Sequence, residues 1–91
     1  MSGRRTAIAR ITNKRGLHAR ASAKIVEASA RFKSQITVRY GDQTVAAESI
    51  LDLMMLAASL GAEVEISAEG PDSGEALTAI LALVEAKFGE E

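Results

Sequence analysis

The sequence predicts an α+β fold, a two-layer open-faced β-sandwich in which a four-stranded antiparallel sheet is covered on one face by three helices. The hydrophobic pattern switches between a period of two and a period near 3.6 along the chain, in the order βαββαβα. Each expected strand has one apolar and one polar face, so helices must cover the apolar face. A chain of 91 residues can bury one modest core, which predicts a single domain over residues 1–91.

The first half of the chain is expected to form a strand, a helix and a β-hairpin. Residues 7–12 alternate as in a half-buried strand, and the pattern ends at a turn over residues 13–16. Residues 19–32 then follow the helical period. Residues 36–40 and 44–47 alternate again, separated by a glycine and an aspartate that favour a hairpin turn.

A second helix is expected after the hairpin. Ser49, followed by Asp52 three residues later, has the spacing of a capping box. Residues 50–60 are mostly apolar and favour a helix, and Gly61 suits the left-handed residue that closes one.

The chain is expected to end with a fourth strand and a third helix. Residues 64–68 alternate between apolar and polar side chains. Asp72 is predicted to cap the last helix, which extends to Phe88 along one apolar stripe.

Composition excludes several classes of protein. Without cysteine and with one histidine, the chain can form neither a disulfide nor a usual zinc site, so we expect no metal and no cofactor. Its longest apolar run is too short to cross a membrane, and its start lacks a signal-peptide pattern, which predicts a cytoplasmic protein with no membrane insertion. Residues 1–40 hold ten of the eleven Lys and Arg, which favours anionic ligands there.

The segment NKRGLHARAS contains the one histidine, His18, between a glycine turn and the start of the first helix. Gly16 permits the turn, and the first amide groups of the helix lack intrahelical partners, so His18 is expected at an anion-binding site. Neutral imidazole can attack phosphorus near pH 7, and Arg20 can bind the phosphoryl oxygens. The amides of Gly16, Ala19 and Arg20 are predicted to cradle the group, while Arg15 and Lys24 add positive field.

Other chemistries lack the residues they need. No serine lies at a strand-to-helix elbow, and no GxxxxGK[ST] loop is present, so the chain is expected to hold a phosphoryl group but not to bind ATP and remove one. It is therefore predicted to be a covalent carrier and not an enzyme.

The sequence resembles the histidine phosphocarrier proteins of the bacterial phosphotransferase system, the HPr/NPr family, in GLHAR, ESILDLMMLAA with the glycine after it, and EALTAILALVEAKF. The resemblance covers nearly the whole chain. It implies that His18 accepts a phosphoryl group on Nδ1 from enzyme I and donates it to an enzyme IIA component, with Arg20 stabilising the phosphate. Family members often carry proline where this chain has Ala21, a change that should reduce rigidity more than chemistry.

The resemblance also implies a partner surface and a regulatory site. The second helix is apolar around most of its circumference, so part of it should stay exposed. The implied partner-binding residues are Leu17, Arg20, Lys24, Ile50, Leu51 and Met54. Ser49 matches a serine that an ATP-dependent HPr kinase phosphorylates in some members, although an N-cap role explains it equally well. The protein is expected to be a monomer.

Two rival functions fit parts of the sequence. An RNA-binding module would need aromatic side chains on the open sheet face, and of three aromatics only Tyr40 lies in a strand, so no nucleic-acid partner is expected. A ferredoxin-like domain that senses a small molecule fits the order of elements, but it gives His18 and Arg20 no role. The sequence does not decide between the sugar-uptake and nitrogen-regulatory branches.

Overall fold

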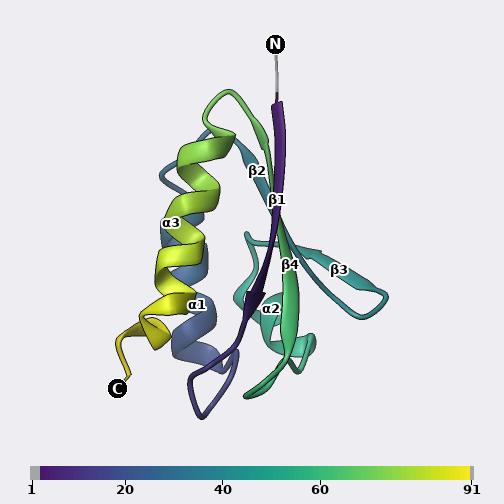
Figure 1. Cartoon of the computed structure of the whole chain (residues 1–91), viewed down its shortest axis with the longest axis vertical. Coiled ribbons are helices and arrows are strands. Elements are labelled where there is room, and N and C mark those ends of the chain that lie inside the picture. Colours follow the sequence, from purple (N-terminus) through teal and green to yellow (C-terminus); the bar gives the residue numbers. More distant parts are fainter. Residues whose placement is uncertain (1–2, 91) are drawn as a thin grey trace.

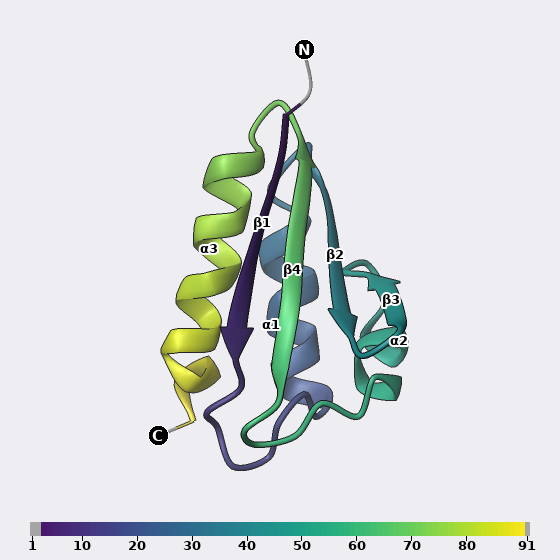
Figure 2. The ribbon, with the colours of Figure 1, turned by 45° about the vertical axis from the view of Figure 1, so that its right-hand side comes forward.

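The computed structural model describes residues 3–90 and confirms the predicted architecture (Figure 1). Its elements follow in the order β1 (Gly3–Arg10), α1 (Ala19–Ser29), β2 (Gln35–Tyr40), β3 (Gln43–Ala46), α2 (Ile50–Met55), β4 (Glu63–Gly70), α3 (Ser73–Glu85) and a short 3-10 turn (Lys87–Gly89). The four strands form one antiparallel sheet in the order β1-β4-β2-β3. Figure 2 shows α1 and α3 lying along the same face of this sheet, with α2 beside β2 and β3.

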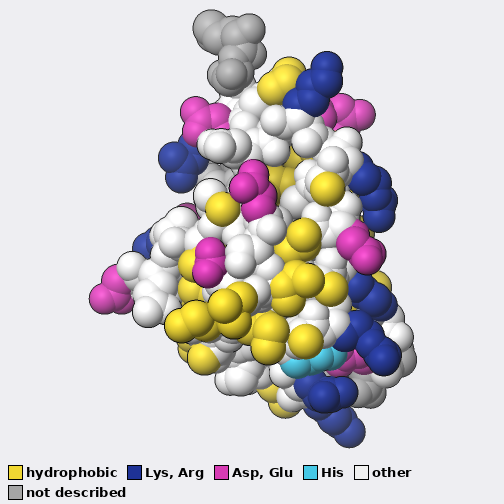
Figure 3. Space-filling model, turned by 180° about the vertical axis from the view of Figure 1, so that it is seen from behind, with side chains coloured by type: hydrophobic (Ala, Val, Ile, Leu, Met, Phe, Trp, Pro, Cys, Tyr) yellow, Lys and Arg dark blue, Asp and Glu magenta, His cyan; other side chains and the backbone are white. Residues whose placement is uncertain are grey.

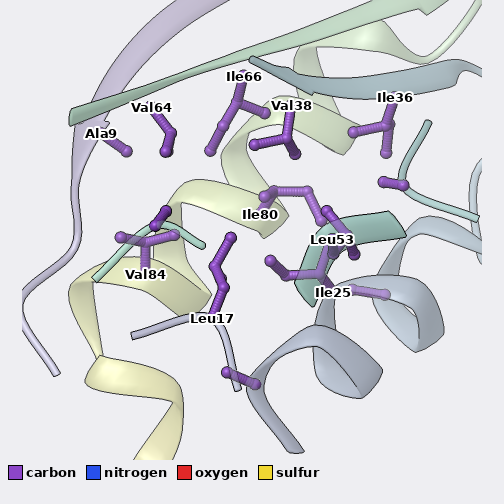
Figure 4. Close-up of a cluster of buried hydrophobic side chains, with 14 of the residues drawn as sticks. Ala9, Leu17, Ile25, Ile36, Val38, Leu53, Val64, Ile66, Ile80 and Val84 are labelled. Atoms are coloured by element: carbon purple, nitrogen blue, oxygen red, sulfur yellow. The ribbon is translucent and has the colours of Figure 1, made fainter. Parts of the chain in front are cut away.

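Alternating side chains divide the sheet into a buried and an open face. The inward residues of three strands pack against the helices in one hydrophobic cluster (Figure 4), which includes Ala9, Ile36, Val38, Val64, Ile66, Ile25, Leu53, Ile80 and Val84. On the open face, Arg10 pairs with Glu63 at 3.2 Å and Arg39 pairs with Glu65 at 2.9 Å. The strand register places each of these arginines directly opposite its glutamate. Opposite charges therefore neutralise each other across this part of the open face.

Helix α2 is shorter than predicted. It ends at Met55 and not at residue 60, and Ala57 has a left-handed backbone with φ of 57°. The apolar run continues past the helix because Leu56 and Ala58 enter the core, at 4% and 3% exposure. Gly61 has φ of 91° and donates its amide to the Ile11 carbonyl at 2.8 Å, so it shapes the turn into β4 and does not close the helix.

The other two helices also end early. After Ser29, the amides of Arg31 and Phe32 bond three residues back, which is a tightened turn and not α-helix. Helix α3 ends at Glu85, yet Phe88 is still buried at 1% exposure because the following 3-10 turn brings it back to the core.

Asp72 stands at the start of α3 but does not cap it with its side chain, contrary to the prediction. Its carboxylate accepts from the amides of Lys33 and Ser34, each at 2.9 Å, and from the Ser34 hydroxyl at 2.6 Å. The Ser34 hydroxyl and these amides lower the pKa of Asp72 below its ordinary value. Asp72 therefore ties the turn before α3 to the turn before β2.

Candidate functional site

His18 is the N-cap residue of α1, at the junction where the sequence places the start of the helix. Its backbone is extended, with φ of −75° and ψ of −178°, and its ring Nδ1 accepts from the Arg20 amide at 3.3 Å. A backbone N–H can only donate, so Nδ1 carries the lone pair of the ring. The imidazole thus occupies the positive end of the helix dipole and satisfies one of the free amides there.

Gly16 allows the His18 loop to lie directly against the segment after α2. A Cβ at this position would lie 2.4 Å from the Ala58 carbonyl oxygen and 2.8 Å from the Ser59 Cα, and the backbone φ is +64°. The adjacent Leu17 amide donates to the same Ala58 oxygen at 3.0 Å. Glycine is therefore required both by conformation and by close approach.

The amide cradle expected from the sequence is only partly available in this structure. The Gly16 amide donates to the Asn13 carbonyl at 3.2 Å, so in this structure it serves the turn, and its contact with an anion stays a prediction. The Arg20 amide is directed at the His18 ring. Ala19 is the first residue of the helix, where an amide has no intrahelical acceptor.

Two further residues meet His18, and the sequence analysis missed both. Glu90 Oε2 contacts His18 Nε2, and the side chains of this pair are 16% and 13% exposed. The Nδ2 of fully buried Asn13 donates to Glu90 Oε1 at 3.2 Å and to the Gly16 carbonyl at 2.8 Å. Glu90 follows His18 by 72 residues, so no local pattern could reveal the contact.

The electrostatics of the site favour a charged Glu90. The hydrogen bond from His18 lowers the pKa of the Glu90 carboxyl most, while burial opposes the shift. The hydrogen bond from Asn13 and the positive charge of Arg15 lower it further. A carboxylate that faces Nε2 accepts the ring proton, which is the arrangement that leaves Nδ1 unprotonated.

A basic hollow surrounds the ring. It has a volume of about 340 Å³ and is lined by Lys14, Arg15, His18, Arg20, Gly89 and Glu90. Figure 3 shows the histidine at the surface among Lys and Arg side chains, with a hydrophobic area directly beside it. In the described part of the chain, no three histidine or carboxylate side chains gather so as to hold a metal ion.

The hydrophobic area is the exposed side of α2 and the segment after it, here called the apolar patch. Its members and their exposed fractions are Ile50 40%, Leu51 64%, Met54 38%, Met55 69% and Leu60 57%. Ile50, Leu51 and Met54 were expected in it, whereas Met55 and Leu60 were not assigned to a surface. The patch continues toward the basic hollow in Figure 3.

Two predicted surface residues have other roles. Leu17 is buried, at 5% exposure, and belongs to the hydrophobic cluster, so it is not part of the exposed patch. The ammonium group of Lys24 donates to the Phe88 carbonyl, which holds it against the C-terminal turn.

Ser49 caps α2 as predicted, since its hydroxyl accepts from the Asp52 amide at 3.1 Å.

Comparison with known proteins agrees with this geometry. Residues 6–86 match the family model described as the PTS HPr component phosphorylation site. The chain is 48% identical over 80 residues to phosphocarrier protein HPr of Cupriavidus necator, covering 88% of this chain and 90% of that one. It is 42% identical over 80 residues to phosphocarrier protein NPr of Shewanella violacea, covering 88% of each.

A solved structure resembles this chain in both fold and sequence. The crystal structure of HPr-C-His from Thermoanaerobacter tengcongensis superimposes with a TM-score of 0.91 at 45% identity, covering 96% of this chain and 98% of that one.

The fold and the partly exposed histidine at a helix start define a histidine phosphocarrier. The chain belongs to the HPr family of the phosphotransferase system and functions as a phosphocarrier of that system. The comparisons do not favour the alternative of a small-molecule-sensing domain. Family membership implies partner proteins of the same system. Among residues 3–90, no helix combines the length and the apolar character that a membrane crossing requires.

Proposed function

We propose that His18 is the phosphoacceptor and that the phosphoryl group is carried on Nδ1. The observation that supports this most strongly is the orientation of the ring. Nδ1 carries its lone pair at the start of α1, where it faces only a backbone amide, while Nε2 faces Glu90. At 3.3 Å the bond from the Arg20 amide is long, so Nδ1 can exchange it for a bond to phosphorus at small cost.

The transfer step follows from that orientation. The Nδ1 lone pair forms a bond to phosphorus while the bond between phosphorus and the donor enzyme breaks, and the donor keeps the electron pair. The Arg20 amide then has no ring acceptor and can donate to a phosphoryl oxygen, together with the Ala19 amide. The Arg20 guanidinium lines the same hollow and can neutralise the transferred charge in a forked geometry.

The partners proposed are enzyme I as phosphoryl donor and enzyme IIA components as acceptors. The apolar patch supports a docking role because several exposed apolar side chains lie together beside the basic hollow. Arg20 at the border of the hollow would meet acidic groups of a partner, and Ile50, Leu51 and Met54 would be covered by it. A compact, partly polar interface suits a transient complex.

The remaining finer assignments are proposals on the same basis. As one domain over residues 1–91, the protein would carry the phosphoryl group without extracting it from a small-molecule substrate, and so would not be an enzyme by itself. Ser49 is proposed as a site for a regulatory kinase; because its hydroxyl accepts from the Asp52 amide, a phosphate there would lie at the amide end of α2. The monomeric state and the cytoplasmic location stay predictions from the sequence.

The test is phosphorylation of the intact protein by phosphoenolpyruvate and a cognate enzyme I. We expect one acid-labile, base-stable phosphate, located on His18 by mass spectrometry after alkaline handling. The His18→Ala variant should take up none, and the Ser49→Ala variant should take up the same amount as the parent protein. Label on a serine, or equal labelling of His18→Ala, would disprove the assignment.

A further inference from the structure

The last part of the described chain is a closely held segment, residues 86–90, here called the C-terminal strap. Lys87, Phe88 and Gly89 all have left-handed backbones, with φ of 55°, 56° and 75°. Such angles are unfavourable for the first two residues, so surrounding contacts must hold them. The strap lies beside the loop between β1 and α1, as the position of the C-terminal end in Figure 1 shows.

Four contacts hold the strap. Phe88 is buried at 1% exposure in the hydrophobic cluster, and its carbonyl accepts from the Lys24 ammonium group. Glu90 is held at both carboxylate oxygens, one by Asn13 and the other by His18. The strained turn therefore brings the Glu90 carboxylate to Nε2 of His18, the ring nitrogen that is not proposed to carry phosphorus.

Asn13 indicates that this carboxylate position is built into the fold. Its Nδ2 serves two acceptors, the Gly16 carbonyl and Glu90, which fixes the orientation of the amide. Its Oδ1 is buried and has no hydrogen-bond partner among the described residues. Leaving a buried acceptor unpaired is unfavourable, so the amide is oriented by the need to donate to both the Gly16 carbonyl and Glu90.

We propose that Glu90 is a positioning residue that keeps the proton on Nε2 of His18 through the whole phosphoryl-transfer cycle. The proposal rests on the assignment of His18 as phosphoacceptor. In the free protein, a proton held at Nε2 leaves the lone pair on Nδ1. After attack, the ring bears phosphorus on Nδ1 and the same proton on Nε2, and Glu90 balances the positive charge that the ring acquires.

Transfer of the phosphoryl group from His18 to an acceptor leaves the same proton in place. When an acceptor attacks phosphorus, the bond between phosphorus and Nδ1 breaks and Nδ1 keeps the electron pair. Because Nε2 still carries its proton, the ring leaves as neutral imidazole, a much better leaving group than an imidazolate. No proton enters or leaves the ring in either direction, which suits a carrier that must transfer reversibly.

The charges around the ring require such a counterion. Lys14 and Arg15 from the preceding loop and Arg20 from α1 line the hollow, and all three disfavour a positively charged ring. Glu90 from the strap is the carboxylate that lines the same hollow. Without it, the basic side chains that attract the phosphoryl group would also promote loss of the Nε2 proton.

The experiment compares Glu90→Gln and Glu90→Ala with Glu85→Gln, which removes an exposed carboxylate from the end of α3. The first readout is the pair of ring ¹⁵N chemical shifts of His18 in the unphosphorylated protein at neutral pH. We expect the parent and Glu85→Gln proteins to show mainly the Nε2–H form, and Glu90→Ala to show a mixture of both neutral forms.

The second readout is the pH profile of phosphoryl transfer from the phosphorylated protein to an enzyme IIA acceptor. Loss of the charge in both Glu90 variants should move the alkaline limb of the profile to lower pH by about one unit, as expected when one nearby opposite charge is removed. Unchanged ring shifts and an unchanged profile in Glu90→Ala would overturn the proposal. The ¹⁵N measurement needs no phosphoryl donor, so it separates this failure from a failure of His18 to accept phosphate.

Discussion

Replacing Gly16 with alanine should cost much more stability than replacing Gly41 with alanine, although the two backbones are alike. Their φ values are +64° and +63°, so each substitution places a Cβ in the left-handed region at a cost of about 1–2 kcal/mol. At Gly41 nothing lies within 4 Å of the added atom. At Gly16 the atom would lie 2.4 Å from the Ala58 carbonyl oxygen, whereas an ordinary contact begins at 3.4 Å.

The additional cost at Gly16 comes from backbone that must move by about 1 Å, which is the difference between those two distances. The movement would also weaken the bond from the Leu17 amide to Ala58, and a lost buried hydrogen bond of this kind is worth roughly 1 kcal/mol. With overpacking of about 1–3 kcal/mol added, Gly16→Ala should lose about 3–6 kcal/mol in total.

Thermal unfolding followed by circular dichroism measures both variants. For a domain of this size, 1 kcal/mol corresponds to roughly 4–8 °C in the melting temperature, so Gly41→Ala should melt about 4–16 °C below the parent protein. Gly16→Ala should melt further below it, or fail to fold at room temperature. Equal losses in the two variants would show that the close approach to Ala58 does not exist and that only backbone conformation matters.

Three other substitutions test separate parts of the structure. Asp72→Asn should remove one contribution to the pH dependence of the free energy of unfolding. The pKa of Asp72 is lowered in the folded protein, so its stabilising contribution is fully present above the ordinary value of 3.8 and is lost as the pH falls through the lower folded value. This loss should be missing from acid unfolding of the variant. Lys87→Gly should raise the free energy of unfolding by up to about 1 kcal/mol in urea titrations, because glycine relieves a left-handed backbone; a loss would contradict the strain. Ser49→Ala should lower it by about 1 kcal/mol through loss of the α2 cap, and no change would refute the cap.

The features that the sequence predicted well depend on residues close together in the chain. The glycine turn, the change of period after it and the resulting place of His18 at a helix start all lie within about ten residues. The cap at Ser49 is equally local, because its acceptor and donor are three residues apart. Alternation along each strand was enough to predict one buried apolar face and one open polar face.

The features that the sequence analysis missed depend on contacts between distant segments. Residues 56–60 look helical by composition, but the chain leaves the helix because Leu56 and Ala58 are needed in the core. Leu17 was expected on the surface, and it is buried because the loop after α2 packs on it and accepts its amide hydrogen bond. The approach of Glu90 to His18 depends on three consecutive left-handed residues, none of which is marked by a local pattern except Gly89.

The arrangement of charge explains why one end of the molecule can serve as the site. Along the open sheet face, acidic residues of β4 stand opposite basic residues of β1 and β2, and the pairs Arg10–Glu63 and Arg39–Glu65 neutralise each other. The loop before α1 and the first turn of α1 have no such acidic strand beside them. Lys14, Arg15 and Arg20 therefore keep their field around His18, and the strap supplies one carboxylate at the nitrogen that does not meet phosphorus. The sheet neutralises Arg10 and Arg39, whereas the basic residues at the helix start keep their charge for an incoming phosphoryl group.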